Sequence, residues 1–471
     1  MKSDKQTVPA ATTGERRALL SLSLAMLLSS LGTSIANVAL PTLSEVFSAS
    51  FQQVQWVVLS YLLAITTLIV SAGRLGDMLG RRRLLLGGVA LFSLASLLCS
   101  YPSLPLLIAA RAIQGAGAAL MMALSMAYVA DIVPRARTGQ AMGLLGTSSA
   151  IGTALGPSLG GLLLGSLGWQ SLFLMLVPLG GLTLLLLQRH LPAGKQAAAP
   201  AGGHDPLGTL LLALSLGCYA LAMTSGHGSW QQSNSTLLLL ALLGGVLFLR
   251  SQQRAATPLI RLSLLRRPQL LLSLLMSGMV AAVVMATLVV GPFYLSRALA
   301  LSSSQLGLVM SAGPLVAALG GVPSGRLVDR YGAGRMVQLG LLAMLAGSCG
   351  LAMLPLSMGS SGYLVAIVTL TAGYALFQAA NNTGVMHGVA AEQRGLISGL
   401  LNLARNLGLI TGAAAMGALF ATASGSVTPG AASAASSSSG LHLTFSLAAL
   451  LIASAMLLGW HGQRVVASRD S

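Results

Sequence analysis

The strongest constraint in this sequence is a succession of apolar segments, each long enough to cross a lipid bilayer. A crossing takes about 20 apolar residues in helical form, because the bilayer core holds no water that could satisfy free backbone groups. Short polar or basic stretches separate the segments, which are expected near residues 18–38, 52–72, 84–101, 104–130, 138–164, 169–187, 207–225, 236–250, 269–295, 304–325, 336–355, 362–385, 395–421 and 441–460. The chain is therefore predicted to be an all-α polytopic membrane protein with fourteen spans.

The composition agrees with a membrane environment. Only 7% of the residues are charged and 55% are hydrophobic, whereas a soluble protein carries about 25% charged residues. So little charge could not cover a surface exposed to water. The first apolar segment is expected to remain as a helix, because it is too long for a signal peptide and leads into further spans without a small-residue cleavage site.

The distribution of basic residues predicts how the chain lies in the membrane. The formal net charge is +17, but the lysines and arginines gather in alternate loops. They do not form one patch with interleaved aromatics, so no nucleic-acid partner is expected. If the N-terminus is cytoplasmic, all of the 26 basic residues except Arg111, Arg297 and Arg405 fall on the cytoplasmic side. The positive-inside rule therefore predicts that both termini are cytoplasmic.

Two internal repeats indicate a duplicated chain. Glycines of the fifth span recur in the thirteenth at an offset of 256 residues, as Gly139, Gly143, Gly152, Gly156 and Gly161 against Gly395, Gly399, Gly408, Gly412 and Gly417. The loops after the second and tenth spans, residues 73–80 and 325–332, match at an offset of 252. We expect two six-helix bundles, residues 1–188 and 269–471, with two inserted central helices in residues 189–268. Parallel repeats are one way of building an alternating-access transporter.

The repeated loop carries a charged motif between two helices. Glycine permits the turn because it tolerates a positive φ, and a carboxylate at a neighbouring helix N-terminus gains roughly 0.3–1 kcal/mol from the helix dipole. Such a contact could hold one conformation closed, whereas the simpler alternative is that the arginines only keep the loop in the cytoplasm. The candidate latch residues are Gly73, Arg74, Gly76, Asp77, Gly80, Arg81 and Arg82, and in the second half Gly325, Asp329, Arg330 and Gly332.

This loop resembles the signature of the major facilitator superfamily, Gly-x-Leu-Ala/Gly-Asp-Arg/Lys-x-Gly-Arg/Lys-Arg/Lys. Met78 stands where the signature usually has a basic residue, so one of the family's loop contacts is expected to be missing. The resemblance implies two helical bundles that rock about a central site. It also implies that the protein works as a monomer.

An arginine within the fourth span resembles the superfamily's second motif. A charged residue inside a span costs at least ~2.5–3.5 kcal/mol on insertion scales, and therefore indicates a functional site. The candidates are Arg111, Gln114 and Gly115, because Gln114 lies one helical turn from Arg111 on the same face. The alternative is an arginine whose side chain extends to the membrane interface.

The fifth span carries a ridge of small residues on which another helix can pack backbone to backbone. Its members are Gly152, Gly156, Pro157, Gly160 and Gly161. A Gly-xxx-Gly pattern alone is common in membrane bundles. Together with Pro157 and the doubled glycine, however, it resembles the antiporter motif of exporters in this superfamily, which favours efflux over uptake.

Two further segments, residues 33–41 and 398–408, resemble the fourteen-span drug:proton antiporter branch. That resemblance implies proton-coupled multidrug efflux, and hence drug resistance, in the inner (cytoplasmic) membrane of a bacterium. The branch normally has an aspartate in the first span where this chain has Gly32. Asp131, at the cytoplasmic end of the fourth span, is the candidate proton site instead. A helix-end charge that pairs with Arg135 or Arg137 is an equally good interpretation of Asp131.

Polar side chains within spans mark a candidate substrate cavity. They are Ser30, Thr33 and Asn37 in the first span, Gln378, Asn381 and Asn382 in the twelfth, and Asn402, Arg405 and Asn406 in the thirteenth. Arg405 lies deep in its span, and no carboxylate is expected at that depth to pair with it. It could attract an anionic or polar substrate, or it could donate to backbone carbonyls. A cavity whose buried charges are positive is a poor site for strongly cationic drugs.

The sequence therefore predicts a secondary active transporter that exports small amphipathic, drug-like compounds in exchange for protons. A metabolite importer or an uncoupled facilitator on the same fold is the alternative, and the missing aspartate is the reason to keep it. An enzyme is not expected, because the spans show no metal cluster, nucleophile-and-base set or phosphate loop. No cofactor or metal is expected, and the predicted partners are a small-molecule substrate, protons and the lipid bilayer.

Overall fold

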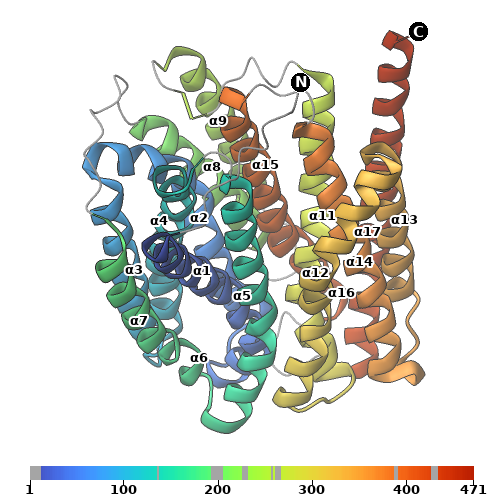
Figure 1. The fold of residues 1–471 in the computed structure, drawn as a ribbon. Coiled ribbons are helices and arrows are strands. Elements are labelled where there is room, and N and C mark those ends of the chain that lie inside the picture. The colour runs from blue at the N-terminus through green and yellow to red at the C-terminus, as the bar shows by residue number, and fades with distance from the viewer. Residues whose placement is uncertain are drawn as a thin grey trace.

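The computed structural model of the chain describes residues 12–134, 137–192, 205–224, 232–255, 258–259, 267–386, 391–425 and 433–470. Every regular element within these residues is helical (Figure 1). The first half contains α1 (Thr13–Val46), α2 (Phe51–Leu79), α3 (Arg81–Leu98), α4 (Leu104–Ile132), α5 (Thr138–Leu167), α6 (Gln170–Leu174) and α7 (Leu176–His190). Two central helices follow, α8 (Pro206–Thr224) and α9 (Gln232–Arg254).

The second half repeats this all-helical plan. It contains α11 (Pro268–Phe293), a π-helical turn η2 (Tyr294–Ala298), α12 (Ser303–Tyr331), α13 (Ala333–Ala352), a 3₁₀ turn η3 (Leu356–Met358), α14 (Gly359–Met386), α15 (Ala391–Thr411), a second π-helical turn η4 (Gly412–Met416), α16 (Gly417–Ala423) and α17 (Ala434–Asp470). The predicted thirteenth span is thus built from α15, η4 and α16 together, and the predicted sixth span from α6 and α7.

The helices are long and apolar enough to cross a bilayer. Thirteen helical segments of the described chain meet that description by length and composition. The predicted span that is not among them is α3, which has only 18 residues and begins with Arg81, Arg82 and Arg83. Beyond those arginines α3 is apolar, and it packs against α4 and α7. The predicted all-α membrane fold is confirmed.

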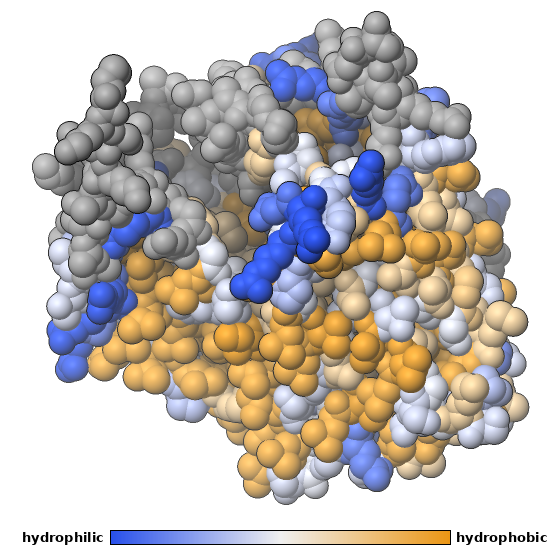
Figure 2. All heavy atoms as spheres, turned by 45° about the vertical axis from the view of Figure 1, so that its right-hand side comes forward, coloured by the Kyte–Doolittle hydropathy of each residue, from blue (hydrophilic) through white to orange (hydrophobic). Residues whose placement is uncertain are grey.

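The surface is that of a protein surrounded by lipid. Figure 2 shows hydrophobic residues over most of the visible face, with hydrophilic residues gathered toward its upper end. Large apolar side chains such as Leu242, Leu319 and Val365 are more than two-thirds exposed, at 67%, 75% and 69%. A monomeric soluble protein does not expose apolar surface on this scale.

Successive spans run antiparallel, so their termini gather at two ends of the bundle. The basic end is defined here as the end at which α1 begins, α2 ends and α3 begins; Arg82, Arg189 and Arg335 lie there. The opposite end is the one at which α2 and α12 begin and α5 ends. In the orientation predicted from the loop charges, the basic end is cytoplasmic.

The offset of 252 residues reappears in the backbone geometry of the two halves. α2 begins with a capping box formed by Ser50 and Gln53, and α12 begins with the same device at Ser302 and Gln305. Each helix also ends at a glycine with positive φ, at +94° for Gly80 and +85° for Gly332. Only glycine adopts that conformation without strain. The duplicated loop therefore fixes the same helix boundaries twice.

Small residues join equivalent helix pairs in each half. A Cβ atom at Gly117 of α4 would lie 2.7 Å from the carbonyl oxygen of Gly88 in α3. In the second half, a Cβ atom at Gly373 of α14 would lie 2.5 Å from the carbonyl oxygen of Gly340 in α13. Both pairs of helices therefore pack backbone to backbone, as small residues allow in membrane bundles.

The two central helices pack against each other and against both halves. α8 is joined to α2 by a hydrogen bond of 3.0 Å from Trp56 Nε1 to Thr224 Oγ1, and by one of 2.7 Å between the hydroxyls of Ser71 and Thr209. On its other side, Leu212 of α8 belongs to an apolar cluster with residues of α11 and α15. The pair thus bridges α2 of the first half and two helices of the second.

Candidate functional site

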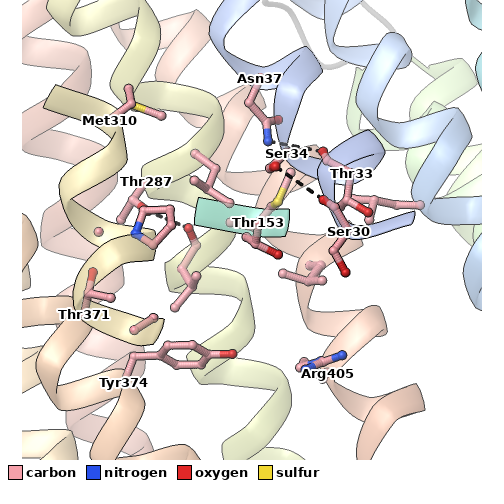
Figure 3. Close-up of a pocket in the computed structure, with 18 of the residues that line it drawn as sticks. Ser30, Thr33, Ser34, Asn37, Thr153, Thr287, Met310, Thr371, Tyr374 and Arg405 are labelled. Carbon is pink, nitrogen blue, oxygen red and sulfur yellow. Dashed lines mark hydrogen bonds between the residues drawn. The ribbon is translucent and has the colours of Figure 1, made fainter. Parts of the chain in front are cut away.

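A cavity of about 210 Å³ lies between the two halves. Its walls come from α1, α2, α4 and α5 of the first half and from α11, α12, α14 and α15 of the second. Five of the residues predicted for the cavity line it, namely Ser30, Thr33, Asn37, Arg405 and Asn406. In Figure 3, Asn37 and Met310 lie toward one end of the cavity, and Arg405 and Tyr374 toward the other.

Four other residues predicted for the cavity are not among those that line it. These are Gln378, Asn381 and Asn382 of α14, and Asn402 of α15. Asn381 instead binds α11, where its Nδ2 donates a 2.9 Å hydrogen bond to Ser277 Oγ. Polar residues within a span can thus serve helix packing as well as a cavity, and sequence alone does not separate the two uses.

Hydroxyl groups that were not predicted make up most of the polar wall. Ser34, Ser149, Thr153, Thr287, Thr371 and Tyr374 line the cavity. Most of these hydroxyls have a partner nearby: Thr153 donates to the carbonyl of Ser149 at 3.1 Å, and Ser149 shares a 2.6 Å hydrogen bond with Ser30. Serine and threonine make such local bonds in any membrane helix, so their sequence positions carried no distinct signal.

Apolar side chains make up the rest of the cavity wall. They include Leu62, Ile65, Met122, Met285, Leu288 and Met310. A mainly apolar pocket with a few placed polar groups is the usual form of a site for small organic molecules. Methionine adapts its shape to different partners, which suits a site that accepts more than one compound.

Arg405 is the only charged residue among those described as lining the cavity. It comes from the middle of α15, and its Nε atom is buried without a hydrogen-bond partner. Within the described residues no acidic side chain pairs with it. The cavity therefore carries one uncompensated positive charge.

Arg111 lies outside this cavity, in a closed network between helices of the first half. Its Nε donates to the carbonyl of Val57 at 2.9 Å, and its Nη1 donates to the carbonyl of Gly32 at 3.0 Å and to the side chain of Gln114. The guanidinium also lies 4.0 Å from the ring centroid of Tyr61. The side chain is fully buried, so it does not extend to the membrane interface.

Other members of the span-4 motif extend the same network. Gln114 Nε2 donates a 2.6 Å hydrogen bond to Ser96 Oγ in α3. A Cβ atom at Gly115 would lie 2.5 Å from the carbonyl oxygen of Tyr61, so this glycine allows α4 to approach α2 closely. The motif therefore connects α1, α2 and α3 to α4.

Gly32 borders this network. The fourteen-span drug:proton antiporter branch, which this chain resembles, usually has an aspartate at this position. A Cβ atom at Gly32 would lie 2.8 Å from Phe92 Cζ and 3.2 Å from the hydroxyl of Tyr61. The ring of Phe92 thus occupies the room that a side chain at position 32 would need. Gly32 is not among the residues that line the cavity.

We predict that Gly32→Asp lowers the thermal stability of the protein, and that adding Phe92→Ala restores part of the loss. The second substitution makes room, and the new carboxylate then lies beside the Arg111 guanidinium. Neighbouring residues of this kind couple by about 0.5–3 kcal/mol. Unfolding midpoints of the wild type, both single variants and the double variant in detergent would measure the coupling. Strictly additive changes would contradict it.

The glycine ridge of α5 packs on both halves of the protein. Gly152 and Gly156 approach Leu27 and Ser34 of α1, and Gly160 approaches Ile35 of the same helix. Gly161 faces the other way: a Cβ atom there would lie 2.6 Å from the Cα atom of Gly307 in α12.

The contact between Gly161 and Gly307 holds the two halves together at the opposite end. Pro157 takes part in it, because its carbonyl oxygen would lie 2.5 Å from a Cβ atom at Gly307. α5 remains helical through Pro157.

A second contact between the halves is the symmetric counterpart of the first. At offsets of 256 and 252 residues, the equivalents of Gly161 and Gly307 in the other half are Gly417 and Gln55. A Cβ atom at Gly417 would indeed meet the side chain of Gln55. Next to it, the rings of Phe51 and Phe293 lie 4.6 Å apart between centroids. Two related contacts thus close the opposite end on both sides of the cavity.

The loop motifs at the basic end bind neighbouring helices of their own half. Arg81 Nη1 donates to the carbonyl of Ala127 in α4 at 3.2 Å, and Arg82 Nη2 donates to the carbonyl of Gln188 in the last turn of α7 at 2.7 Å. Gly76 lies against Leu124 of α4, whereas Gly73 has open space around it. The side chains of Arg74 and Asp77 lie outside the described residues, as does that of the proposed proton site Asp131.

The matching loop of the second half is more open. Asp329 and Arg330 are exposed, and the Arg330 guanidinium lies 5.3 Å from the ring centroid of Tyr331. Gly325 has open space beside it, and Gly332 supplies the turn. The role of both loops as conformational latches stays a prediction.

A cavity between two similar helical bundles is the architecture of a secondary transporter. A profile of the Major Facilitator Superfamily matches residues 22–413. The chain belongs to this superfamily, and the resemblance predicted from its motifs is confirmed. It is a multi-pass membrane transporter and not an enzyme.

Similar proteins include transporters whose names give different functions. The chain is 35% identical over 403 residues to the "Uncharacterized transporter YebQ" of Escherichia coli K12, covering 84% of this chain and 87% of that protein. It is 33% identical over 438 residues to the "Drug efflux pump JefA" of Mycobacterium tuberculosis, covering 89% and 83%. It is 29% identical over 404 residues to the "Riboflavin transporter RibZ" of Clostridioides difficile, covering 86% and 88%.

Among solved structures, a bacterial homologue of the human lysosomal transporter Spinster has the same fold. The two superpose with a TM-score of 0.70 over 97% of this chain and 98% of that one, at 16% sequence identity.

Proposed function

We propose that this protein exports small amphipathic organic molecules across the inner (cytoplasmic) membrane of a bacterium by alternating access. The observation that carries the proposal is the cavity between the two halves, which combines a mainly apolar wall with a few hydroxyls, two asparagines and one arginine. Similarity to JefA, which is named a drug efflux pump, supports a substrate of this kind. The orientation predicted from the loop charges places both termini in the cytoplasm.

The glycine ridge of α5 supports the direction of transport. Its resemblance to the antiporter motif of exporters favours efflux, and its end at Pro157 and Gly161 lies where α5 meets α12 (Figure 1). Alternating access requires a contact of this kind to form and separate as the halves rock. Export follows if the cavity loads from the cytoplasm and discharges when the opposite end separates.

We infer proton exchange as the energy source only from the resemblance. A coupled carrier needs a group whose protonation changes as the site switches sides. The described residues that line the cavity include no aspartate, glutamate or histidine. Asp131 therefore stays the proposed proton site.

A second candidate function is uncoupled or inward transport of a metabolite. The specific observation that favours it is that the described residues of the cavity wall include no aspartate, glutamate or histidine. RibZ, a relative of comparable similarity, is named a riboflavin transporter. The substrates of proteins similar to this chain are therefore not restricted to drugs.

Dye efflux from cells that overproduce the protein distinguishes these functions. We expect efflux of amphipathic dyes that a protonophore reduces at least tenfold and that Asp131→Asn abolishes. Asp205→Asn is the matched control, because Asp205 caps α8 through the backbone N–H of Gly208 and asparagine caps equally well. Efflux that the protonophore does not change would contradict proton coupling. Net uptake of the dye would contradict the proposed direction of transport.

A further inference from the structure

The protein contains two arginines at membrane depth whose surroundings differ completely. Arg111 makes hydrogen bonds to two carbonyls and a glutamine and stacks on Tyr61. Arg405 makes no hydrogen bond or ion pair within the described residues, and its Nε is buried without a partner. The fold thus binds Arg111 through Nε and Nη1 and leaves only its Nη2 without a partner, whereas it supplies no hydrogen bond to Arg405 among the described residues.

We propose that Arg405 is an anion-binding subsite and that the transported substrates are amphipathic organic anions. This inference rests on the proposed function, since it takes the cavity as the substrate site. It adds the chemical class: an apolar body with a carboxylate, sulfonate or similar acidic group.

Physical chemistry explains why Arg405 requires such a partner. The guanidinium group of arginine carries a delocalised positive charge in proteins. A charge at membrane depth is therefore expensive unless it is paired or hydrated. A carboxylate or sulfonate can accept two parallel hydrogen bonds from one guanidinium.

The internal repeat has no arginine at the equivalent position of the first half. At the offset of 256 residues, Arg405 of α15 is equivalent to Ser149 of α5, and both residues line the cavity. In the first half, the serine is accommodated by a 2.6 Å hydrogen bond to Ser30. The two halves therefore share one helix position at the cavity but differ there in charge. This asymmetry assigns the arginine to the ligand rather than to the fold.

The remaining cavity wall suits the rest of such a ligand. Asn406 follows Arg405 and also lines the cavity, where its amide can donate a further hydrogen bond. On α11, which packs against α15, Met285 and Leu288 also line the cavity and offer apolar surface to a hydrophobic body. No described lining residue is acidic, so a permanently cationic molecule would meet only a like charge.

A pair of dyes with one aromatic body tests the charge requirement. 8-Anilinonaphthalene-1-sulfonate carries a sulfonate, and N-phenyl-1-naphthylamine lacks it. Binding is measured by equilibrium dialysis of the purified chain with detergent on both sides, and transport is measured in inside-out vesicles. Ethidium supplies the cationic comparison.

We expect Arg405→Ser, which installs the residue of the equivalent position, to weaken sulfonate-dye binding and transport at least tenfold. The neutral dye should change less than twofold, and Arg405→Lys should retain part of the sulfonate preference. Arg335→Ser is the matched control, because Arg335 is exposed at the start of α13.

The possible failures are distinguishable. Unchanged sulfonate-dye affinity in Arg405→Ser, or a wild-type preference for ethidium, would overturn the anion subsite while transport of the neutral dye left the proposed function intact. If the wild type neither binds nor transports any of the three dyes, both the subsite and the proposed function fail.

Discussion

Gly307→Leu is expected to slow transport strongly while leaving each six-helix half folded. Gly307 and Gly161 meet across the interface between α12 and α5, and a Cβ atom at Gly307 would lie 2.5 Å from the carbonyl oxygen of Pro157 and 2.6 Å from the Cα atom of Gly161. These neighbours are backbone atoms, which cannot rotate away. The leucine can therefore be accommodated only if the halves separate at the opposite end.

The size of the effect follows from overpacking. Inserting carbon atoms into a tight contact costs typically 1–3 kcal/mol or more, which shifts a two-state equilibrium by about 5- to 150-fold. A transporter that must pass through the closed state in every cycle should then slow by at least about fivefold. The population with the opposite end open should rise in proportion.

Two measurements check this expectation. Initial rates of dye transport give the loss of activity, and labelling of Thr287→Cys by an impermeant maleimide from outside gives the exposure of the cavity, in a background without the three native cysteines. Gly321→Leu is the matched control, because it lies on the same helix with open space around its Cα. Wild-type transport by Gly307→Leu would show that this contact need not close.

The repeat was the part of the fold most accessible to sequence reasoning. Glycines recur where helices touch, and contact geometry is inherited with the residues, so equal offsets predict equal contacts. The pairs Gly88 with Gly117 and Gly340 with Gly373 are such duplicated contacts. Sequence could not predict which contacts join the halves, because Gly161 and Gly160 are adjacent but face different helices.

The cavity was only partly predictable, for a related reason. Polarity within a span indicates that a side chain avoids lipid, but it does not say what the side chain meets instead. Asn381 meets Ser277 of another helix, whereas Arg405 meets the cavity. That difference depends on the rotation of each helix about its axis, which many apolar contacts decide together.

Arg111→Ala is expected to destabilise the protein severely, in contrast to Arg405→Ser. The change removes hydrogen bonds to Val57, Gly32 and Gln114 and the stacking on Tyr61, and it leaves a hole in a fully buried region. Hydrogen bonds of charged groups contribute roughly 1.5–3 kcal/mol each, so a loss of at least about 3 kcal/mol is expected. Arg111→Lys should not restore it, because the single nitrogen of a lysine cannot replace the separate Nε and Nη1 atoms of the planar guanidinium.

Thermal unfolding of purified protein in detergent checks the contrast between the two arginines. Arg111→Ala should lower the unfolding midpoint and the yield of folded protein, whereas Arg405→Ser should leave the midpoint within experimental error and change only ligand binding. The opposite reading of Arg111, as a transport residue, makes a different prediction. It requires that Arg111→Ala keep the wild-type midpoint and lose transport, and that result would replace the structural role by a functional one. The same two variants therefore test both assignments. Loss of a structural arginine lowers the unfolding midpoint, whereas loss of a ligand-binding arginine lowers only ligand binding.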